Sequence, residues 1–457
     1  MPAFTLEEVL QATGASEVRS GQKTFTDIVT DTRKIADGVL FVAFKGERFN
    51  GEDFAAEALQ KGAAGVMVSL DCEPEKLAAC EGTVLQAADT LTAYQLLAQA
   101  WRQKFPQLSV IAITGSNGKT TTKDLTAAVL SARGPVLKTQ ANFNNEIGLP
   151  LTLLGIRPEH TAAVVEIGMR GFHQIDALAP LAQPQIGIVT NVGETHMELL
   201  GSLENIARAK SELVESIPAG GTVILNSDNP YVAGMRDKAK AGVRVLTFGI
   251  DKPADVRGSA IVTADAQTTF AVTYEGETHS YTVAMVGRHN VYNSLAAIAA
   301  GFAEGLTPKE IHAGLMNLEA TKMRFECQKV KEWQVVNDAY NASPMSMTAA
   351  INTLSDLTKG RKIAVMGDML ELGSVSESAH RRVGQELAEH QFAAVITRGV
   401  MGNFIAAGAK TGGVPVVESC SSHEEAAAKL HEILQPGDTI LFKGSRGMQM
   451  EKVIDLL

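Results

Sequence analysis

Short hydrophobic runs recur along most of the chain, and segments with the apolar spacing of helices separate them. Runs with little polar alternation are typical of strands covered on both faces, as in a parallel sheet. The pattern therefore predicts an α/β fold. The runs that carry this prediction are residues 39–44, 65–68, 110–113, 163–165, 186–189, 223–225, 243–246, 335–336, 363–366, 394–396 and 439–442.

One segment departs from this pattern. Residues 268–274 and 281–283 are strand-like and flank the turn Glu275-Gly276-Glu277, which predicts an antiparallel hairpin appended to the sheet. The order of elements divides the chain into three α/β domains, of which the middle one is the largest. We place them at residues 1–84, 85–320 and 321–457, with residues 85–107 as a linker helix at the start of the middle domain.

Composition narrows the class of protein. The 457 residues include 41 Lys and Arg against 51 Asp and Glu, a formal net charge of −10, and are 45% apolar. These values exclude wholesale disorder, and the acidic balance argues against a nucleic-acid partner. Four cysteines without a CxxC pair fit a reducing compartment. The first residues lack the pattern of a signal peptide, and no run approaches the ~18 apolar residues of a membrane span. We expect a cytoplasmic protein that does not cross a membrane.

A phosphate-binding loop is the strongest local signal. Residues 114–121, Thr-Gly-Ser-Asn-Gly-Lys-Thr-Thr, follow an apolar run and precede a helix-forming stretch. Glycines let backbone N–H groups turn toward an anion, and the helix N-terminus adds the positive end of its dipole. Lys119 offers a charge for the β- and γ-phosphates and Thr120 a hydroxyl for Mg²⁺, although two residues, not the usual four, separate the glycines. A glycine turn with a surface lysine is the alternative. The predicted nucleotide-binding residues are Gly115, Ser116, Asn117, Gly118, Lys119, Thr120 and Thr121.

Three further polar residues follow or neighbour predicted strands. Glu166 comes directly after the run 163–165, where open α/β sheets place ligand-binding groups, and a carboxylate near a triphosphate commonly binds Mg²⁺. His196 closes the stretch 190–196, again after a strand, and a metal or phosphate role is favoured there. Lys210 lies on a predicted helix. Taken singly, Glu166 could be a solvent carboxylate, His196 an ordinary loop histidine and Lys210 a solvated lysine.

Together these segments resemble the Mur ligase family, which builds the peptide stem of bacterial peptidoglycan. The resemblance covers nearly all 457 residues. It is carried by TGSNGKTT at 114–121, NFNNEIGLP at 142–150, EIGMRG at 166–171, NVGETHMELLGS at 191–202 and GRHNVYNSLAA at 287–297.

Within the family, the resemblance is strongest to the branch that adds D-alanyl-D-alanine to UDP-N-acetylmuramoyl-tripeptide. Ser343 stands where this branch usually has asparagine, a change that we expect to leave the reaction unaltered. The resemblance implies a UDP-sugar-binding first domain and an ATP-binding middle domain, whose mostly parallel P-loop sheet has helices on both faces. It also implies a Rossmann-like third domain that binds the dipeptide. The narrower assignment rests on residues 32–35, 40–51, 337–344 and 367–373, and on the absence of the DNPR-type signature of the diaminoacid-adding branch.

The resemblance also implies the chemistry. The tripeptide carboxylate attacks the γ-phosphate of ATP, ADP leaves, and the dipeptide amine attacks the acyl phosphate. The catalytic residues would be Lys119, Glu166, His196 and Lys210. Two Mg²⁺ ions would be held by Thr120, Glu166, His196 and Lys210. Lys210 matches a lysine that relatives carry as a carbamate. Beyond the loop, ATP would contact Asn290, Arg324 and Asp338. The UDP-sugar would contact Thr32, Arg33 and the loop at residues 45–51, which includes Lys45 and Gly46. Asn144 and Asn145 would contact substrate, and Tyr340 and Asn341 the dipeptide.

Other functions stay open at this point. A relative with the same ATP chemistry would add a diaminoacid or, as folylpolyglutamate synthase does, glutamate. The UDP-binding-like first domain disfavours folate, and the missing DNPR disfavours the diaminoacid. A nucleotide-dependent switch or scaffold would bind nucleotide without turnover that depends on both peptide substrates. It would leave Glu166, His196 and Lys210 unexplained. We expect a monomer, and the third residue of the tripeptide, diaminopimelate or lysine, stays open.

Overall fold

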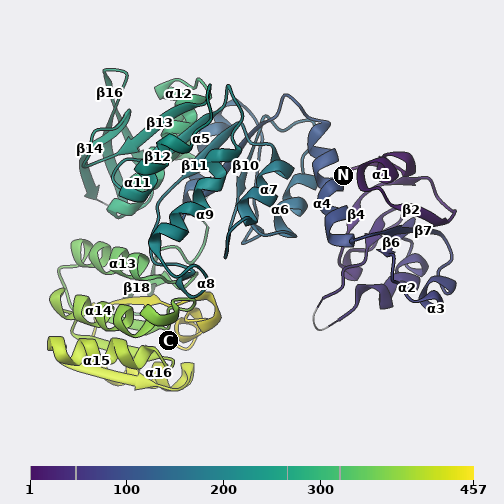
Figure 1. Ribbon diagram of the computed structural model, residues 1–457. Coiled ribbons are helices and arrows are strands. Elements are labelled where there is room, and N and C mark those ends of the chain that lie inside the picture. Colours follow the sequence, from purple (N-terminus) through teal and green to yellow (C-terminus); the bar gives the residue numbers. More distant parts are fainter. Residues whose placement is uncertain (1, 47–48, 265, 319–320) are drawn as a thin grey trace. The chain divides into compact units, whose positions relative to one another are not determined.

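The computed structural model describes residues 2–46, 49–264, 266–318 and 321–457. Glu47 and Arg48 of the predicted UDP-sugar loop, and Ala320 at the predicted end of the middle domain, lie outside the described residues. The chain forms two compact units, whose elements are labelled in Figure 1. Unit 1 comprises Met1–Ala112, Arg133–Gly168 and Asp176–Gln185, and unit 2 comprises Ile113–Ala132, Met169–Ile175 and Ile186–Leu457.

Unit 1 contains a five-stranded sheet in its N-terminal part. Four of its strands pair in parallel and one edge strand pairs antiparallel. Phe41, Val66 and Val84 lie in the buried cluster that covers this sheet, so the apolar runs at 39–44 and 65–68 form strands as predicted. Across the sheet the strands are β2 (Ser16–Arg19), β7 (Thr83–Ala87), β6 (Gly65–Ser69), β5 (Leu40–Val42) and β4 (Ile28–Val29).

The rest of unit 1 includes helix α4 (Thr90–Gln103), which lies within the predicted linker at residues 85–107. It also includes two strands, β9 (Val136–Lys138) and β10 (Ala162–Glu166), which pair in parallel. The elements are β1 (Phe4–Thr5), α1 (Leu6–Thr13), β3 (Thr24–Phe25), η1 (Thr32–Lys34), η2 (Gly51–Phe54), α2 (Ala55–Gln60), α3 (Pro74–Ala78), α4 (Thr90–Gln103), β9 (Val136–Lys138), α6 (Gly148–Leu154) and β10 (Ala162–Glu166). Three elements, β8 (Ser109–Thr114), η3 (Ser131–Arg133) and α7 (Gln174–Ala182), contribute residues to both units.

Unit 2 begins with parallel strands and continues into antiparallel ones. β11 (Ile186–Val189), β12 (Thr222–Asn226), β13 (Arg244–Gly249) and β14 (Val256–Ala264) pair in parallel, each with the next. β15 (Gln267–Tyr274) pairs antiparallel with both β14 and β16 (Glu277–Val283), which confirms the predicted hairpin and adds a third antiparallel strand. The helices are α5 (Lys119–Leu130), α8 (Met197–Leu200), α9 (Leu203–Ser216), α10 (Pro230–Ala233), α11 (Arg288–Ala303) and α12 (Pro308–Met316).

The C-terminal part of unit 2 is a six-stranded sheet with a buried cluster on each face. Along its strands, successive apolar residues alternate between the two clusters: Ile363 and Val365 lie in one, and Ala364 and Met366 in the other. This is the two-residue period of a strand buried on both faces. Helices α13 (Pro344–Leu357), α14 (Ser376–Glu389) and α15 (Gly402–Gly412) supply residues to one cluster, and α16 (His423–Ile433) and α17 (Glu451–Ile454) to the other.

In this sheet only the edge strand β17 is antiparallel. The strand order is β17 (Glu326–Val330), β18 (Trp333–Asp338), β22 (Thr439–Lys443), β19 (Lys362–Gly367), β20 (Ala394–Arg398) and β21 (Val416–Cys420). The helices are α13 (Pro344–Leu357), η5 (Gly373–Val375), α14 (Ser376–Glu389), α15 (Gly402–Gly412), α16 (His423–Ile433), η6 (Arg446–Met448) and α17 (Glu451–Ile454). None of the helices in the described part of the chain is long and apolar enough to span a bilayer.

Candidate active site

The phosphate loop lies between strand β8 and helix α5, as predicted. Gly115 and Gly118 have backbone φ angles of 148° and 81°, a region that residues with a side chain rarely adopt. A Cβ atom on Gly115 would collide with the hydroxyl of Thr190, and one on Gly118 with the amide oxygen of Asn293. The loop therefore needs both glycines for its conformation and for its packing.

The segment that follows β11 holds the loop in place. The backbone N–H of Ser116 donates to the carbonyl of Asn191 at 2.9 Å, and the N–H of Asn117 donates to the Asn191 Oδ1 at 2.8 Å. Thr190 Oγ1 donates to the Asn117 carbonyl at 2.6 Å, and Gly193 N–H donates to Ser116 Oγ at 2.9 Å. Sequence reasoning singled out this stretch for His196 and missed Thr190 and Asn191.

Two asparagines of α11 connect this helix to the loop. Asn293 accepts from the Thr122 hydroxyl at 3.2 Å and donates to Asn290 Oδ1 at 3.1 Å. Asn290, the predicted nucleotide contact, is buried and donates to the Val286 carbonyl at 2.8 Å. Asn293 was not predicted as a site residue, yet it is the one whose oxygen lies beside Gly118.

Two lysines lie in this region and differ in their surroundings. Lys119 Nζ donates to the Gly115 carbonyl at 2.8 Å, back across its own loop. Lys210 on α9 is buried, and burial together with repulsion from Lys119 holds the pKa of its amine well below the ordinary lysine value. A neutral amine is nucleophilic, so Lys210 has the chemistry needed to add CO₂.

Arg324 brings a cation from the start of the C-terminal part to the loop. Its Nη2 donates to Thr120 Oγ1 at 3.0 Å, and its guanidinium lies 4.0 Å from the ring centroid of Tyr340. The Nε atom is buried and has no hydrogen-bond partner within the described residues. A guanidinium with an unsatisfied donor is a ready contact for an anion such as phosphate.

The end of β18 carries an ion pair between a half-buried carboxylate and a buried lysine. Asp338 Oδ2 lies 2.5 Å from Lys443 Nζ, and its Oδ1 accepts from the Phe325 N–H at 3.1 Å. Burial lowers the pKa of Lys443, while Asp338 opposes that shift. Lys443 also donates to the Asn341 carbonyl at 3.1 Å. The structure thus brings Asp338 and Asn341 together around Lys443, a residue that sequence reasoning did not select.

His196, directly before α8, faces the C-terminal sheet. Its Nδ1 lies 2.7 Å from Oε2 of Glu371, in the segment after β19. Nearby, Ser343 Oγ donates to Asn117 Oδ1 at 2.8 Å. The loop and His196 therefore both contact the C-terminal part of unit 2.

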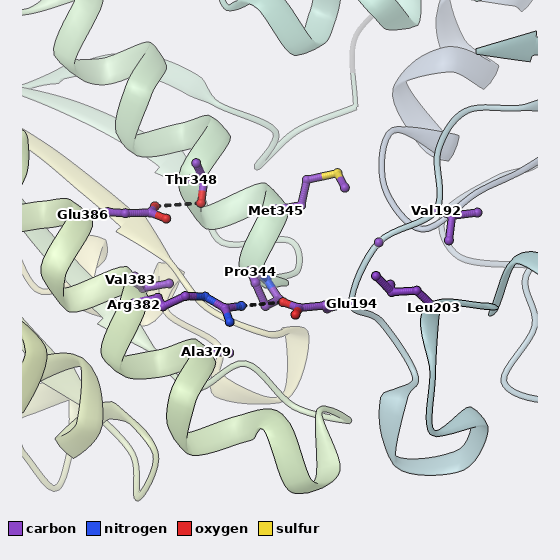
Figure 2. Close-up of a pocket in the computed structure, with 11 residues that line it drawn as sticks. Val192, Glu194, Leu203, Pro344, Met345, Thr348, Ala379, Arg382, Val383 and Glu386 are labelled. Atoms are coloured by element: carbon purple, nitrogen blue, oxygen red, sulfur yellow. Dashed lines mark hydrogen bonds and ion pairs between the residues drawn. The ribbon is translucent and has the colours of Figure 1, made fainter. Parts of the chain in front are cut away.

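A pocket of about 260 Å³ lies beside these contacts (Figure 2). Arg382 Nη2 and Glu194 Oε2 form an ion pair of 2.6 Å within it, and Thr348 donates to Glu386 at 2.7 Å. The other walls are mainly apolar. They consist of Val192, Gly193, Leu203, Pro344, Met345, Ala379 and Val383.

In unit 1, Glu166 ends β10 and is buried. Its Oε1 accepts from the Asn144 amide at 2.7 Å, and its backbone N–H donates to Thr139 Oγ1 at 3.0 Å. Asn145 has a structural contact, because its Oδ1 accepts from the N–H of Gly148 at 2.9 Å at the start of α6. The structure therefore brings Glu166 and Asn144 together.

The predicted UDP-sugar residues lie in two places in unit 1. Arg33, in η1 with Thr32, is highly exposed and pairs with Asp31 at 2.7 Å. Lys45 lies 2.6 Å from Asp71 and 3.5 Å from the buried Glu52. Gly46 donates its N–H to the Phe49 carbonyl at 2.9 Å.

The side chains available as ligands limit how a metal ion could bind. Across residues 2–46, 49–264, 266–318 and 321–457, no group of three or more His, Cys, Asp or Glu could hold one by itself. Mg²⁺ at nucleotide sites is commonly bound through one or two protein oxygens, with water and phosphate oxygens completing its shell. Single residues such as Thr120 and Glu166 fit that mode.

Comparison with known proteins gives a consistent result. Sequence models match at residues 24–102 (Mur ligase family, catalytic domain), 113–301 (Mur ligase middle domain) and 323–446 (Mur ligase, glutamate ligase domain). The UDP-N-acetylmuramoyl-tripeptide–D-alanyl-D-alanine ligase of Bacillus subtilis is 40% identical over 95% of this chain and 93% of its own length. The enzyme of that name from Escherichia coli is 35% identical over 96% and 95%.

Solved structures agree. MurF from Acinetobacter baumannii aligns with a TM-score of 0.92 and 32% identity over 100% of this chain and 99% of its own. MurF ligase from Thermotoga maritima, solved in complex with ADP, aligns with a TM-score of 0.84 and 26% identity over 94% and 96%.

Proposed function

This chain belongs to the Mur ligase family, and we propose that it adds D-alanyl-D-alanine to UDP-N-acetylmuramoyl-tripeptide at the expense of ATP. The main support is the extent of the likeness, because 40% identity to a relative of that name runs over 95% of the chain. The matched residues therefore include the C-terminal part, where the incoming amine is expected to bind. A relative that shared only the ATP chemistry would not need to match there.

The reaction joins a carboxylate to an amine through an acyl phosphate. An oxygen of the tripeptide carboxylate bonds to the γ-phosphorus of ATP, and the bond to the ADP oxygen breaks. The dipeptide nitrogen then bonds to the acyl carbon, loses a proton, and phosphate leaves. ATP and a UDP-sugar are intracellular metabolites, so we place this reaction in the cytoplasm.

Residues of the phosphate loop would position the nucleotide. The N–H groups at the start of α5, with the positive end of the helix dipole, suit a phosphate, and Lys119 and Arg324 would offset its charge. Positioning and charge neutralisation are the main contributions that a protein makes to phosphoryl transfer. Asn290 and Asp338 would contact the nucleoside, and Tyr340 and Asn341 the dipeptide.

Magnesium fits the oxygen donors of the site. Thr120 and Glu166 would hold one ion and His196 and a carbamate on Lys210 a second. When bound, Mg²⁺ would neutralise charge on the phosphate oxygens. In unit 1, Thr32, Arg33, Lys45 and Gly46 would bind the UDP-sugar, and Asn144 and Asn145 would contact substrate.

The decisive experiment measures phosphate release with Mg²⁺-ATP and UDP-N-acetylmuramoyl-tripeptide, with and without D-alanyl-D-alanine. We expect release that depends on the dipeptide and a product heavier by that unit in mass spectrometry. Activity with a free diaminoacid or glutamate instead would keep the ATP chemistry and reject the proposed acceptor. Tight ATP binding without turnover for any acceptor would favour a switch.

The carbamate has a test of its own. Protein equilibrated with ¹³C-bicarbonate should give a ¹³C carbamate signal that is absent in Lys210→Arg. Lys123, also buried on a helix, provides a control, since Lys123→Arg should keep the signal. A signal that survives Lys210→Arg would place the modification elsewhere, and no signal at all would leave Lys210 as a bare amine.

A further inference from the structure

Two chain segments meet beside His196. One is residues 196–198, at the start of α8, and the other is residues 371–373, before α14. Besides the 2.7 Å contact between His196 Nδ1 and Glu371 Oε2, the N–H of Glu198 donates to the Glu371 carbonyl at 3.3 Å. A Cβ atom on Gly373 would lie 2.9 Å from the Glu198 Cα, so only glycine allows this approach.

Both facing residues have an uncommon backbone conformation. His196 has a φ of 54° and Glu371 a φ of 65°, in the left-handed region that few non-glycine residues adopt. Such residues persist where the surrounding structure determines them, and they gather at functional sites. The side chains of these two residues, both with a left-handed backbone, point toward each other.

The segment that carries Glu371 is fixed by the C-terminal sheet behind it. The N–H of Met369 donates to Nε2 of His380, which is fully buried, at 2.9 Å, and the Nδ1 of His380 contacts the Ser376 carbonyl at 2.7 Å. The N–H of Leu370 donates to Ser445 Oγ at 2.9 Å. The Glu371 carboxylate is thus presented by a segment held at two successive backbone N–H groups.

We propose that Glu371 is a positioning residue that fixes the tautomer and the ring orientation of His196. With its proton on Nδ1, the imidazole faces the carboxylate oxygen 2.7 Å away and keeps its lone pair on Nε2, which then serves as the ligand for a divalent cation. This inference rests on the proposed function, in which His196 holds Mg²⁺. It assigns to the C-terminal part of the chain a role in arranging the phosphate side of the reaction.

The test reads the tautomer directly, in the full chain labelled with ¹⁵N-histidine and free of nucleotide and metal. Long-range ¹H–¹⁵N correlation should show His196 as the Nδ1–H tautomer, with the signal identified by its loss in His196→Gln. Glu371→Ala should shift His196 to the Nε2–H tautomer. Glu371→Gln should retain the Nδ1–H form, because an amide oxygen still accepts. Since the Glu371 side chain is 46% exposed, we expect both variants to fold.

Glu377 on α14 provides the matched control, because it is a glutamate of the same part of the chain whose carboxylate pairs with Arg381 at 3.0 Å. Glu377→Ala should leave the tautomer unchanged. With an unhydrolysable ATP analogue present, Glu371→Ala should weaken Mn²⁺ binding about tenfold or more, and Glu377→Ala should not. An Nε2–H tautomer in the unmodified protein, or no change in Glu371→Ala, would overturn the proposal.

The two proposals fail separately. Turnover that depends on the dipeptide, combined with a tautomer insensitive to Glu371, would reject the positioning role alone. A tautomer that responds to Glu371 in a protein without such turnover would reject the proposed function and retain the positioning role.

Discussion

At the residue scale, the phosphate loop depends on neighbours that occupy the space where a side chain would project. Gly118 is the sharpest case, because it combines a φ of 81° with the Asn293 oxygen at the position of a Cβ atom. Gly220 has nearly the same φ, 85°, and nothing within 4 Å of that position. Substitutions at the two glycines therefore distinguish the cost of the left-handed backbone from the cost of crowding by Asn293.

We predict that Gly118→Ala weakens ATP binding at least tenfold, because the loop must move away from Asn293. Gly220→Ala should cost about 1–2 kcal/mol of unfolding free energy through its φ angle alone and leave ATP binding intact. Isothermal titration calorimetry with ATP measures the affinity of both variants, and urea unfolding measures their unfolding free energy. Equal loss of ATP affinity in the two variants would show that crowding at Asn293 is unimportant.

A second residue-scale effect concerns pH. Burial lowers the pKa of His289, at the start of α11, to about 4, with Asp338 opposing the shift and Lys443 adding to it. Below pH 6.5, the ordinary value for histidine, the unfolded chain takes up a proton that the folded chain does not bind until about pH 4. The free energy of unfolding therefore falls as the pH drops through this window.

We predict that His289→Gln reduces this pH dependence. Between pH 7 and pH 5, the unmodified protein should lose up to about 2 kcal/mol more unfolding free energy than the variant. Urea unfolding at the two pH values measures the difference. Parallel losses in both proteins would mean that His289 titrates normally in the folded state.

At the scale of elements, helix α13 connects the C-terminal sheet to the phosphate loop through its first residues. Ser343 is the N-cap, since its Oγ accepts from the N–H of Ser346 at 3.3 Å, and the same hydroxyl donates to Asn117. Serine and asparagine are both favoured at N-caps. This explains in physical terms why either serine or asparagine could cap the helix at position 343.

We predict that Ser343→Ala lowers the unfolding free energy by about 1 kcal/mol and also raises the KM for ATP, because Asn117 loses a partner. Ser343→Asn should keep the cap. Ser422 caps α16 in the same way, accepting from the Glu425 N–H at 3.1 Å, so Ser422→Ala should match the loss of stability without changing the KM. Steady-state kinetics with unfolding curves distinguish the two effects.

The strands also show which parts of the fold the sequence predicts and which it does not. Buried strands such as β12 and β19 were predicted because each is a continuous apolar run. The edge strand β17 was missed, because its residues are exposed or half-buried and have no such run. The loop from Gly115 to Thr121 was predicted from local spacing, whereas Asn293, Lys443 and Glu371 were not, since their contacts depend on distant parts of the chain meeting.

At the scale of the whole molecule, the two units interleave along the sequence. The chain passes between them after Ala112, Ala132, Gly168, Ile175 and Gln185. The six-stranded sheet is different, because all of its strands come from one continuous stretch, residues 326–443. A continuous piece with its own core can fold alone.

We predict that residues 321–457 fold as an isolated fragment with cooperative urea unfolding. Residues 186–320, a fragment of nearly equal length, should not, because they lack α5. That helix packs so closely on α11 that a Cβ on Gly301 would lie 2.8 Å from the Val129 side chain. Circular dichroism of the two fragments checks this, and a folded 186–320 would contradict it.

The strand order of that sheet has a consequence for protein synthesis. β22 is made after the other five strands, yet it lies between β18 and β19 and pairs with both. Until β22 has left the ribosome, the nascent sheet is split through its centre, and both buried clusters lack the strand that joins their halves. A chain terminated before β22 would stay exposed to proteases, so complete translation is a condition for the C-terminal part to fold.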